Sequence, residues 1–355
     1  MKRFLFILIL LLISILYYLS YNNIKNYIEH FESLNKNNIL DISNRKFPFR
    51  YFKDENNNIL PIVAITAFFR SDEDKKLYYN YINFDIKVIG VTAYKTFPLK
   101  IRDNAEDKYH LTDDFNYTKE IKIWLTCMNN LELYNFDFQY NKVINMSESD
   151  FYDIDIIDDT SIFKKYDFIY ICNKDTDECP LNGWNAINRN YALALKCFPI
   201  MINEYNLKGL CVGRINCNEL NIYKDNITVT DFIPWNELQQ KMRESKFLFV
   251  PNIYDASPRV VVECLIKNVP VLMNSNIICG FKYINENTGE FFIDENNIRN
   301  GLDNILYKIA NNLYNIKDWW NNNYGINKSS VELRNFLYQY YPNILKNTQK
   351  VSFII

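Results

Sequence analysis

The stretch that decides the fold is residues 249–291, FVPNIYDASPRVVVECLIKNVPVLMNSNIICGFKYINENTGEF. An apolar strand ends in a polar loop, and a short helix with an acidic residue in its second turn follows. A break, a second apolar strand at 269–273 and a glycine-containing loop complete the unit. Ser257 suits a helix N-cap, and Pro258 suits the first helical position, where its missing N–H costs nothing. This order predicts a strand–helix–strand crossover in a parallel α/β sheet.

The start of this helix is a predicted anion site. Unpaired backbone N–H groups and the helix dipole favour a diphosphate there, and Arg259 adds a guanidinium. Glu263 lies further along the helix, where it could accept hydrogen bonds from ribose hydroxyls. Asp255, in the loop before the helix, could hold sugar hydroxyls. The alternative is an ordinary crossover helix whose Glu263 is merely solvated.

The motifs resemble GT-B-fold glycosyltransferases, particularly the retaining group with two acids in an E-x7-E arrangement followed by a small-x-P-V strand. The matching motifs are DASPRVVVE (255–263), KNVPVLM (267–273), ICGFKY (278–283), NTGEFF (287–292) and, upstream, ITVTDFIPWNELQQKMRESKFLFVPN (227–252). The resemblance covers roughly residues 165–295, about one Rossmann-like domain. It implies transfer of a hexosyl group from a nucleotide-sugar donor to a glycan, protein or lipid acceptor, with retention of anomeric configuration and no metal.

The resemblance also implies roles for particular residues, although two features depart from the family pattern. The first acid is Asp255 instead of Glu, and the family's Arg/Lys pair at the first strand-to-helix turn is not plainly present after the strand at 167–172. Of the basic candidates Lys174, Arg189 and Arg214, Arg214 is preferred because it ends a strand at the ligand-binding edge of an open α/β sheet. Lys174 is expected to be a surface charge. The expected catalytic residues are Asp255 and Arg214, and the expected donor-binding residues are Ser257, Arg259, Glu263, Gly280 and Arg189.

Length and composition fit a two-domain protein. The 355 residues are 48% hydrophobic, which is ample for two cores. The formal charge of −2 supplies no basic field to recommend a nucleic-acid partner. Alternating strands and helices predict two Rossmann-like domains facing a cleft, each with a doubly wound parallel sheet. The acceptor-side domain is predicted at 59–160 and the nucleotide-sugar-binding domain at 161–327, and the resemblance implies that a helical segment at 328–355 packs back towards the first domain.

The N-terminus predicts a membrane anchor at residues 1–21. Lys2 and Arg3 precede the apolar run FLFILILLLISILYYLSY, whose length is at the lower end of a bilayer span. No small-x-small cleavage site follows, and the terminal aromatics suit a membrane interface. We expect an uncleaved signal anchor with a short cytoplasmic N-terminus, followed by a polar stem at 22–58. A cleaved signal peptide is the alternative.

The eight cysteines show no C-x-x-C pair, so the sequence does not predict a zinc site. Cys172, Cys211 and Cys264 lie in apolar segments and are expected to be buried thiols. In an enzyme across the membrane, Cys172 with Cys179, or Cys211 with Cys217, could form disulfides, but the sequence cannot pair them.

The first domain offers few candidate site residues. Gly90 is its only glycine, so the glycine-rich loop that the resembling family often places opposite the donor is missing. Arg70 or Asp72, after the first strand, could line the cleft. His110, in a loop, is expected to be solvated.

Two other functions remain open from the sequence. One is a metal-dependent transferase of the GT-A fold, in which Asp175 and Asp177, or the acidic pair at 153 and 155, would hold a hard cation. That interpretation leaves the helix at 257–263 and the following P-V strand unexplained. The other is a non-catalytic, anchored GT-B-like binding protein, favoured by the two departures from the family pattern. No metal or cofactor is expected beyond the nucleotide-sugar co-substrate.

Overall fold

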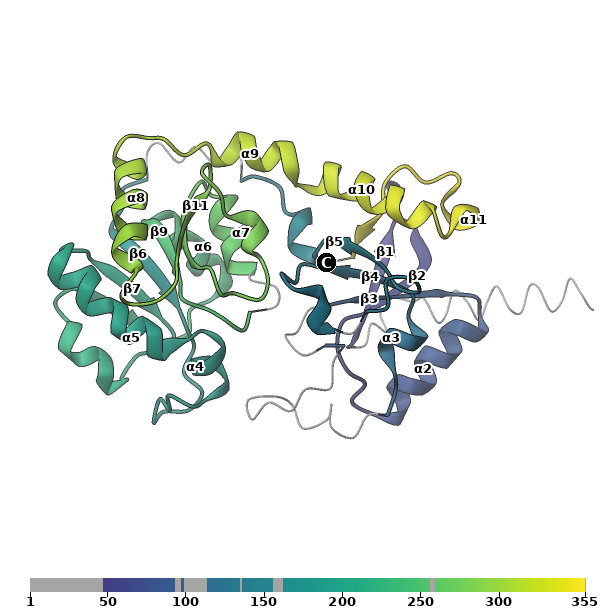
Figure 1. Ribbon diagram of the computed structural model, residues 1–355, viewed down its shortest axis with the longest axis horizontal. Helices are drawn as coiled ribbons and strands as arrows, with labels where there is room; N and C mark the ends of the chain where they lie inside the picture. Colours follow the sequence, from purple (N-terminus) through teal and green to yellow (C-terminus); the bar gives the residue numbers. More distant parts are fainter. Residues whose placement is uncertain are drawn as a thin grey trace, which may run out of the picture.

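The computed structural model describes residues 47–92, 97–98, 114–134, 136–155, 162–255 and 259–354 (Figure 1). The predicted anchor at 1–21, most of the predicted stem, His110 and Ser257 lie outside the described residues. Within the described ranges, none of the helices combines the length and the apolar character needed to cross a bilayer.

One half of the molecule is built on a six-stranded sheet in the order β12-β1-β2-β3-β4-β5. β2 to β5 are parallel and follow one another in chain order, so the doubly wound arrangement predicted for this half is wrong. β1 pairs antiparallel with β2, which places residues 49–53 in the sheet and not in the predicted stem at 22–58. The strands are β1 (Phe49–Lys53), β2 (Ile59–Ile65), β3 (Lys87–Val91), β4 (Ile123–Thr126), β5 (Lys142–Asn145) and β12 (Ser352–Phe353).

The two faces of this first sheet are covered by segments from opposite ends of the chain. Val63 and Ile65 of β2 point to a face that packs on Tyr78 and Tyr81 of α2 (Asp72–Asn83). A capping box between Ser71 and Asp74 starts α2 by satisfying its first backbone N–H groups. The smaller helical elements of this half are α3 (Tyr117–Glu120), η3 (Leu131–Tyr134) and η4 (Glu148–Phe151).

The other face is covered by the C-terminal segment. Ile62 and Ala64, which alternate with the residues of the first face, pack with Leu333 and Leu337 of α10 (Ile326–Tyr338). The chain continues through α11 (Pro342–Leu345), and β12 then pairs antiparallel with β1 at the sheet edge. α9 (Ile316–Asn323) and α10 therefore carry the chain back from the second half to the first, as Figure 1 shows.

The second sheet is entirely parallel and runs in the order β11-β10-β9-β6-β7-β8. Its strands are buried apolar runs with helices on both faces, which is what all-parallel sheets require. Tyr170 and Cys211 pack towards α5, whereas Ile169 and Leu210 pack towards α6 and α7. The strands are β6 (Tyr166–Ile171), β7 (Gly209–Val212), β8 (Ile227–Thr230), β9 (Ser245–Val250), β10 (Val271–Asn274) and β11 (Gly289–Phe292). The helical elements are α4 (Trp184–Asn188), α5 (Tyr191–Pro199), the π-helix η6 (Ile200–Glu204), η7 (Asn218–Tyr223), α6 (Trp235–Arg243), α7 (Arg259–Leu265), η8 (Phe281–Tyr283) and α8 (Ile298–Ala310).

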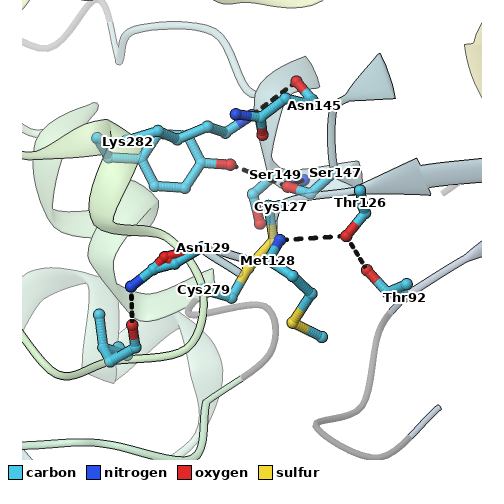
Figure 2. Close-up of a disulfide and its surroundings, with 12 residues drawn as sticks. Thr92, Thr126, Cys127, Met128, Asn129, Asn145, Ser147, Ser149, Cys279 and Lys282 are labelled. Atoms are coloured by element: carbon cyan, nitrogen blue, oxygen red, sulfur yellow. Dashed lines mark hydrogen bonds between the residues drawn. A yellow bond between two sulfur atoms is a disulfide. The ribbon is translucent and has the colours of Figure 1, made fainter. Parts of the chain in front are cut away.

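A disulfide joins the two halves where the carboxyl ends of β4 and β10 approach each other. Cys127, directly after β4, is bonded to Cys279 in the loop after β10 (Figure 2). Beside it, Met128 and Cys279 form an antiparallel bridge, and the Asn129 amide nitrogen Nδ2 donates to the Ile277 carbonyl at 2.9 Å. The loops after these two strands are therefore held together covalently and by hydrogen bonds.

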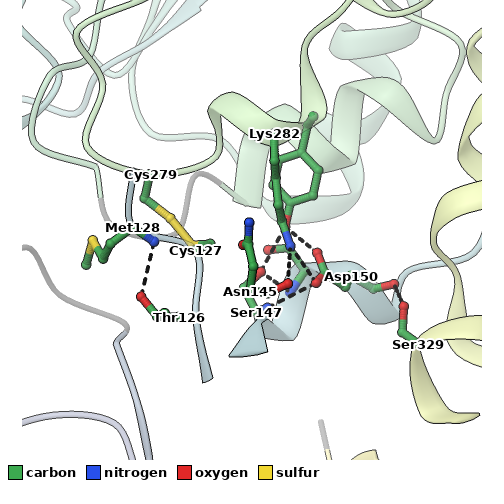
Figure 3. Close-up of polar contacts among 11 residues, drawn as sticks. Thr126, Cys127, Met128, Asn145, Ser147, Asp150, Cys279, Lys282 and Ser329 are labelled. Carbon is green, nitrogen blue, oxygen red and sulfur yellow. Dashed lines mark hydrogen bonds and ion pairs between the residues drawn. A yellow bond between two sulfur atoms is a disulfide. The ribbon is translucent and has the colours of Figure 1, made fainter. Parts of the chain in front are cut away.

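A buried polar cluster reinforces the same junction (Figure 3). The Asp150 carboxylate, in η4 of the first half, accepts from the Tyr283 hydroxyl at 2.5 Å and pairs with Lys282 Nζ at 2.7 Å. The Tyr283 hydroxyl also lies 2.9 Å from Ser147 Oγ. Because Asp150 and Tyr283 are 2% and 0% exposed, these contacts replace water completely around the carboxylate. Burial raises the pKa of Tyr283, so its hydroxyl stays protonated and able to donate.

The cysteines divide into two disulfides and four buried thiols. Cys179, in the loop after β6, is bonded to Cys217 in the loop after β7. The thiols predicted at Cys172, Cys211 and Cys264 are confirmed, and Cys197 is also free. Neither of the pairings considered from sequence is formed, because Cys172 and Cys211 are buried thiols and their expected partners, Cys179 and Cys217, are bonded to each other.

Candidate functional site

The order of the second sheet places a candidate ligand site at one point along its edge. The chain builds β6, β7 and β8 outward in one direction and then returns to add β9, β10 and β11 on the other side of β6. In open α/β sheets, ligands bind outside the carboxyl ends of the strands where the strand order reverses. Here that point lies between β6 and β9, so the segments after these two strands flank the candidate site.

Asp255 and Arg189 meet across this reversal point. Arg189 ends α4, in the segment after β6, and its Nη1 is paired with Asp255 Oδ2, in the loop after β9. Asn252 Nδ2 donates to the same carboxylate oxygen at 3.0 Å. The Asp255 side chain is 10% exposed, so its carboxylate is largely shielded from solvent. The Arg189 side chain is 30% exposed, so part of its guanidinium remains accessible to solvent.

A break in the helical segment positions Arg189. The sequence predicts one helix over residues 185–205, but Asn190 adopts a left-handed conformation with φ 47° and separates α4 from α5. Asn tolerates this conformation better than most residues, and its Nδ2 donates to the Pro251 carbonyl at 3.0 Å, which ties the break to the loop after β9. Arg189 is therefore held against the loop that contains Asp255.

Glu263 is buried and is not the solvated residue of the alternative interpretation. It lies in α7 and is 4% exposed. Its carboxylate accepts from Trp235 Nε1 at 3.3 Å and from Gln239 Nε2 at 3.5 Å, both from α6. Arg259 Nε, on a side chain that is 69% exposed, lies 3.8 Å away. Buried carboxylates are costly unless they are paired and hydrogen-bonded; the two donors from α6 and the ion pair with Arg259 supply the compensation.

Arg214 lies inside the second domain, packed against Cys172 and Tyr191. The residue is fully buried, and its guanidinium stacks over the Tyr191 ring at 4.2 Å. Its Nε and Nη2 contact Cys172 Sγ at 3.3 and 3.1 Å, whereas Nη1 has no hydrogen-bond partner among the described residues. Burial opposes its charge, but Cys172 raises its pKa and the net shift is upward. Burial also raises the pKa of Tyr191 and of the Cys211 thiol, so both stay neutral beside it.

The remaining candidates lie at separate places. Gly280 has φ 84°, a left-handed conformation that favours glycine, and begins η8 directly after the interdomain disulfide. In the first domain, Arg70 packs over the Phe47 ring at 4.2 Å, and Asp72 is in the first turn of α2.

The acidic pairs considered for a metal are used structurally. Asp175 accepts from the backbone N–H groups of Asn185 and Ala186 at 2.8 and 3.3 Å, which caps the start of α4. Asp177 pairs with Lys174 at 2.8 Å on the surface, and this hydrogen bond lowers the pKa of Asp177. Across the part of the chain that the structure describes, no three His, Cys, Asp or Glu side chains gather closely enough to hold a metal ion.

Trp235 is the residue at this site that sequence analysis missed. It is 63% exposed although its indole N–H reaches the buried Glu263. The available signal was a Pro-Trp dipeptide opening a polar helix, because a large aromatic residue on a polar helix has no core to fill.

Comparison with known proteins shows which fold this is. No protein-family model and no curated protein sequence matches the chain. Among solved structures, the sucrose-phosphate synthase of Thermosynechococcus elongatus superposes with a TM-score of 0.55 and 12% identity over 80% of this chain and 74% of its own. TarM of S. aureus superposes with a TM-score of 0.50 and 14% identity over 73% of this chain and 52% of its own.

The pneumococcal O-GlcNAc transferase GtfA, solved in complex with UDP and GlcNAc, gives a TM-score of 0.50 and 10% identity over 78% of this chain and 55% of its own. This chain therefore spans about half the length of TarM and GtfA. At such identities the likeness establishes the fold and not the substrate. The chain has the two-domain GT-B fold of these glycosyltransferases.

Proposed function

We propose that the protein is a hexosyltransferase that moves a sugar from a nucleotide-sugar donor to a glycan, protein or lipid acceptor, with retention and without a metal. The observation that carries the proposal is the meeting of Arg189 and Asp255 at the reversal point of the second sheet, with buried Glu263 in the helix that follows. The GT-B fold supports it, since the relatives in this fold include transferases solved with UDP and a sugar.

Each residue has a distinct role in this proposal. Arg189, held by Asp255 and partly exposed, faces the diphosphate and stabilises the negative charge that develops as the sugar departs. A fixed guanidinium stabilises such charge effectively because it needs no reorganisation during the reaction. The Asp255 carboxylate accepts from sugar hydroxyls. Glu263 accepts from ribose hydroxyls, which replace the Trp235 and Gln239 donors that occupy its carboxylate.

Arg214, Gly280 and Ser257 keep subsidiary roles in the proposal. Arg214 acts through the packing beneath α5 and does not touch the donor, because its guanidinium is fully buried. Gly280 shapes the loop after β10, and Arg259, largely exposed, approaches the diphosphate. Ser257 lies outside the described residues and stays a proposed donor-binding residue.

The test compares two ligands on two variants. Glu263→Gln keeps the shape of the side chain but removes the charge that strengthens its hydrogen bonds, which are worth roughly 1.5–3 kcal/mol. UDP and UDP-sugar should therefore both bind about ten- to a hundredfold more weakly. Asp255→Asn should weaken the intact UDP-sugar more than UDP. Titration calorimetry with GDP and ADP in parallel identifies the base.

Glu290→Gln is the matched control. Like Glu263, Glu290 is shielded from solvent and paired with a basic side chain, Lys308 at 2.6 Å, but it lies on the edge strand β11. Its substitution should leave both affinities unchanged. If Glu263→Gln binds UDP as tightly as the wild type does, Glu263 does not bind the ribose. If EDTA abolishes sugar transfer and manganese restores it, the enzyme is metal-dependent.

We also propose that residues 1–21 anchor the enzyme in a membrane as a single-pass protein with a short cytoplasmic N-terminus. Deleting residues 1–45 leaves β1 intact, since that strand begins at Phe49. The shortened protein should be soluble without detergent and should bind the donor as the full chain does. Membrane association of the shortened protein in cell fractionation would contradict the anchor.

A further inference from the structure

The loop that contains Asp255 is connected to the first domain by a chain of hydrogen bonds. Ile253, in this loop after β9, accepts at its carbonyl from the Ile278 N–H at 3.0 Å, in the loop after β10. The Ile278 carbonyl accepts in turn from the Asn129 N–H at 2.8 Å, in the segment after β4. Asn129 Nδ2 adds the bond to the Ile277 carbonyl at 2.9 Å. Three segments that are far apart in the sequence therefore meet at one place.

A covalent bond makes this connection permanent. Cys127 and Cys279 form the interdomain disulfide beside the hydrogen bonds (Figure 2). The two cysteines are 1% and 0% exposed, so reductants in the solvent have little access to the sulfur atoms, unlike those of the exposed, labile disulfides that act as switches. We call this arrangement the bridging contact, which consists of residues 127–129, residues 277–279 and Ile253.

The Asp255 carboxylate depends on the loop that the bridging contact holds. Asn252 Nδ2 donates to it at 3.0 Å from within the same loop, and Arg189 is paired with it. The Glu263 carboxylate is held separately, because its donors at 3.3 and 3.5 Å come from α6. A loop that is already fixed loses less conformational freedom when a ligand binds, which favours binding. Loosening the loop should therefore affect Asp255 and leave Glu263 in place.

We propose that Cys127, Cys279 and Asn129 are positioning residues of the donor site, which hold the loop after β9 so that Asp255 meets the donor sugar in a fixed geometry. The first domain contributes to sugar binding in the second domain through this link. The inference rests on the proposed function, because it takes Asp255 to be the residue that accepts from the sugar. It predicts that breaking the bridging contact weakens a nucleotide-sugar but not the free nucleotide diphosphate, which lacks the sugar.

The experiment measures the affinities of UDP-glucose and UDP by titration calorimetry on four folded proteins. These are the wild type, the double variant Cys127→Ser/Cys279→Ser, Asn129→Ala and the control Leu333→Ala. Leu333 is fully buried in the core of the first domain, in a cluster that contains none of the bridging residues. Its truncation also destabilises the first domain, because it leaves a cavity, so it controls for a general loss of stability.

The double variant should bind UDP-glucose about tenfold more weakly than the wild type, which corresponds to about 1.4 kcal/mol and is about the cost of ordering one residue. It should bind UDP as the wild type does. Asn129→Ala, which keeps the disulfide and loses one hydrogen bond, should bind UDP-glucose about threefold more weakly. Leu333→Ala should bind both ligands as the wild type does.

Amide hydrogen exchange gives a readout that needs no ligand. The peptide of residues 251–255 should exchange faster in the double variant and in Asn129→Ala than in the wild type and Leu333→Ala, because exchange reports local opening. Unchanged exchange in this peptide would overturn the inference. Equal weakening of UDP and UDP-glucose would also overturn it, because that result would show a general loss of the site.

The outcomes separate this inference from the proposed function. Unchanged UDP-glucose affinity in the double variant would refute the positioning role alone. Failure of both UDP-glucose and UDP to bind the wild type would refute the proposed function with it. If the double variant does not fold, Asn129→Ala decides between these outcomes, since it retains the covalent link.

Discussion

Tyr283→Phe tests whether the polar cluster at the domain junction stabilises the arrangement of the two domains. The substitution removes one hydroxyl and leaves the ring, which packs at 5.8 Å from Trp320 and 5.3 Å from Tyr324. The hydroxyl donates to Asp150 Oδ1 at 2.5 Å and contacts Ser147 Oγ at 2.9 Å. Its loss leaves a buried carboxylate with one donor fewer.

The expected cost follows from the partners that remain. A hydrogen bond to a charged group contributes roughly 1.5–3 kcal/mol. Asp150 Oδ2 keeps Lys282 Nζ at 2.7 Å and the Ser147 backbone N–H at 3.1 Å, so the charge of the carboxylate stays paired. We therefore expect the free energy of unfolding to fall by about 2 kcal/mol, towards the lower part of that range. Urea unfolding with the disulfides intact, followed by tryptophan fluorescence, measures it.

Tyr324→Phe is the matched control, because no hydrogen bond to its hydroxyl is found among the described residues while its ring belongs to the same aromatic group. Its cost should be within about 0.5 kcal/mol, as for substitutions that break no buried network. If Tyr283→Phe unfolds at the same urea concentration as Tyr324→Phe, the junction cluster does not stabilise the fold.

Three further outcomes are expected. Burial raises the pKa of Tyr78 and of Tyr341 to about 12 each, above the value of about 10 in an unfolded chain. The stability that these neutral tyrosines contribute is therefore complete below about pH 10 and is lost as the pH rises towards 12. The urea midpoint should fall over that window, and a midpoint that does not change with pH would contradict the burial. Deleting residues 326–355 removes the helices that cover one face of the first sheet, so the product should bind a hydrophobic dye strongly, and a compact product that excludes the dye would contradict that packing. Replacing Cys127 and Cys279 by serine removes a link across 152 residues of chain, which should lower the free energy of unfolding in urea by up to about 5 kcal/mol. This loss should exceed the loss caused by the same change at the disulfide of the second domain, which spans 38 residues. A larger loss at the second-domain disulfide would show that the interdomain link does not restrict the unfolded chain.

The sequence by itself determined most elements of the second domain and their parallel arrangement, although not the break at Asn190. Apolar runs such as 247–250 and 269–273 indicate strands, and the amphipathic segment between them indicates a helix. These patterns depend only on residues close together in the sequence, so they can be recognised without the tertiary structure. The burial of Cys172, Cys211 and Cys264 followed from the same apolar context and is confirmed. The resemblance to GT-B transferases, taken from motif order, agrees with the fold observed.

Only the tertiary structure decided which distant residues meet. Arg189 and Asp255 are 66 positions apart, and their contact depends on β6 and β9 being neighbours, which no local pattern encodes. The same holds for Cys127 and Cys279, whose partners could not be assigned from spacing. The physical reason is that strand order and domain packing are set by the sum of many long-range burials, so a residue's neighbours across the sheet are fixed only when the whole core has formed. Arg214 illustrates the consequence: its position at a strand end was predictable, but whether its side chain turns to the ligand edge or into the core was decided by Tyr191 and Cys172 packed around it.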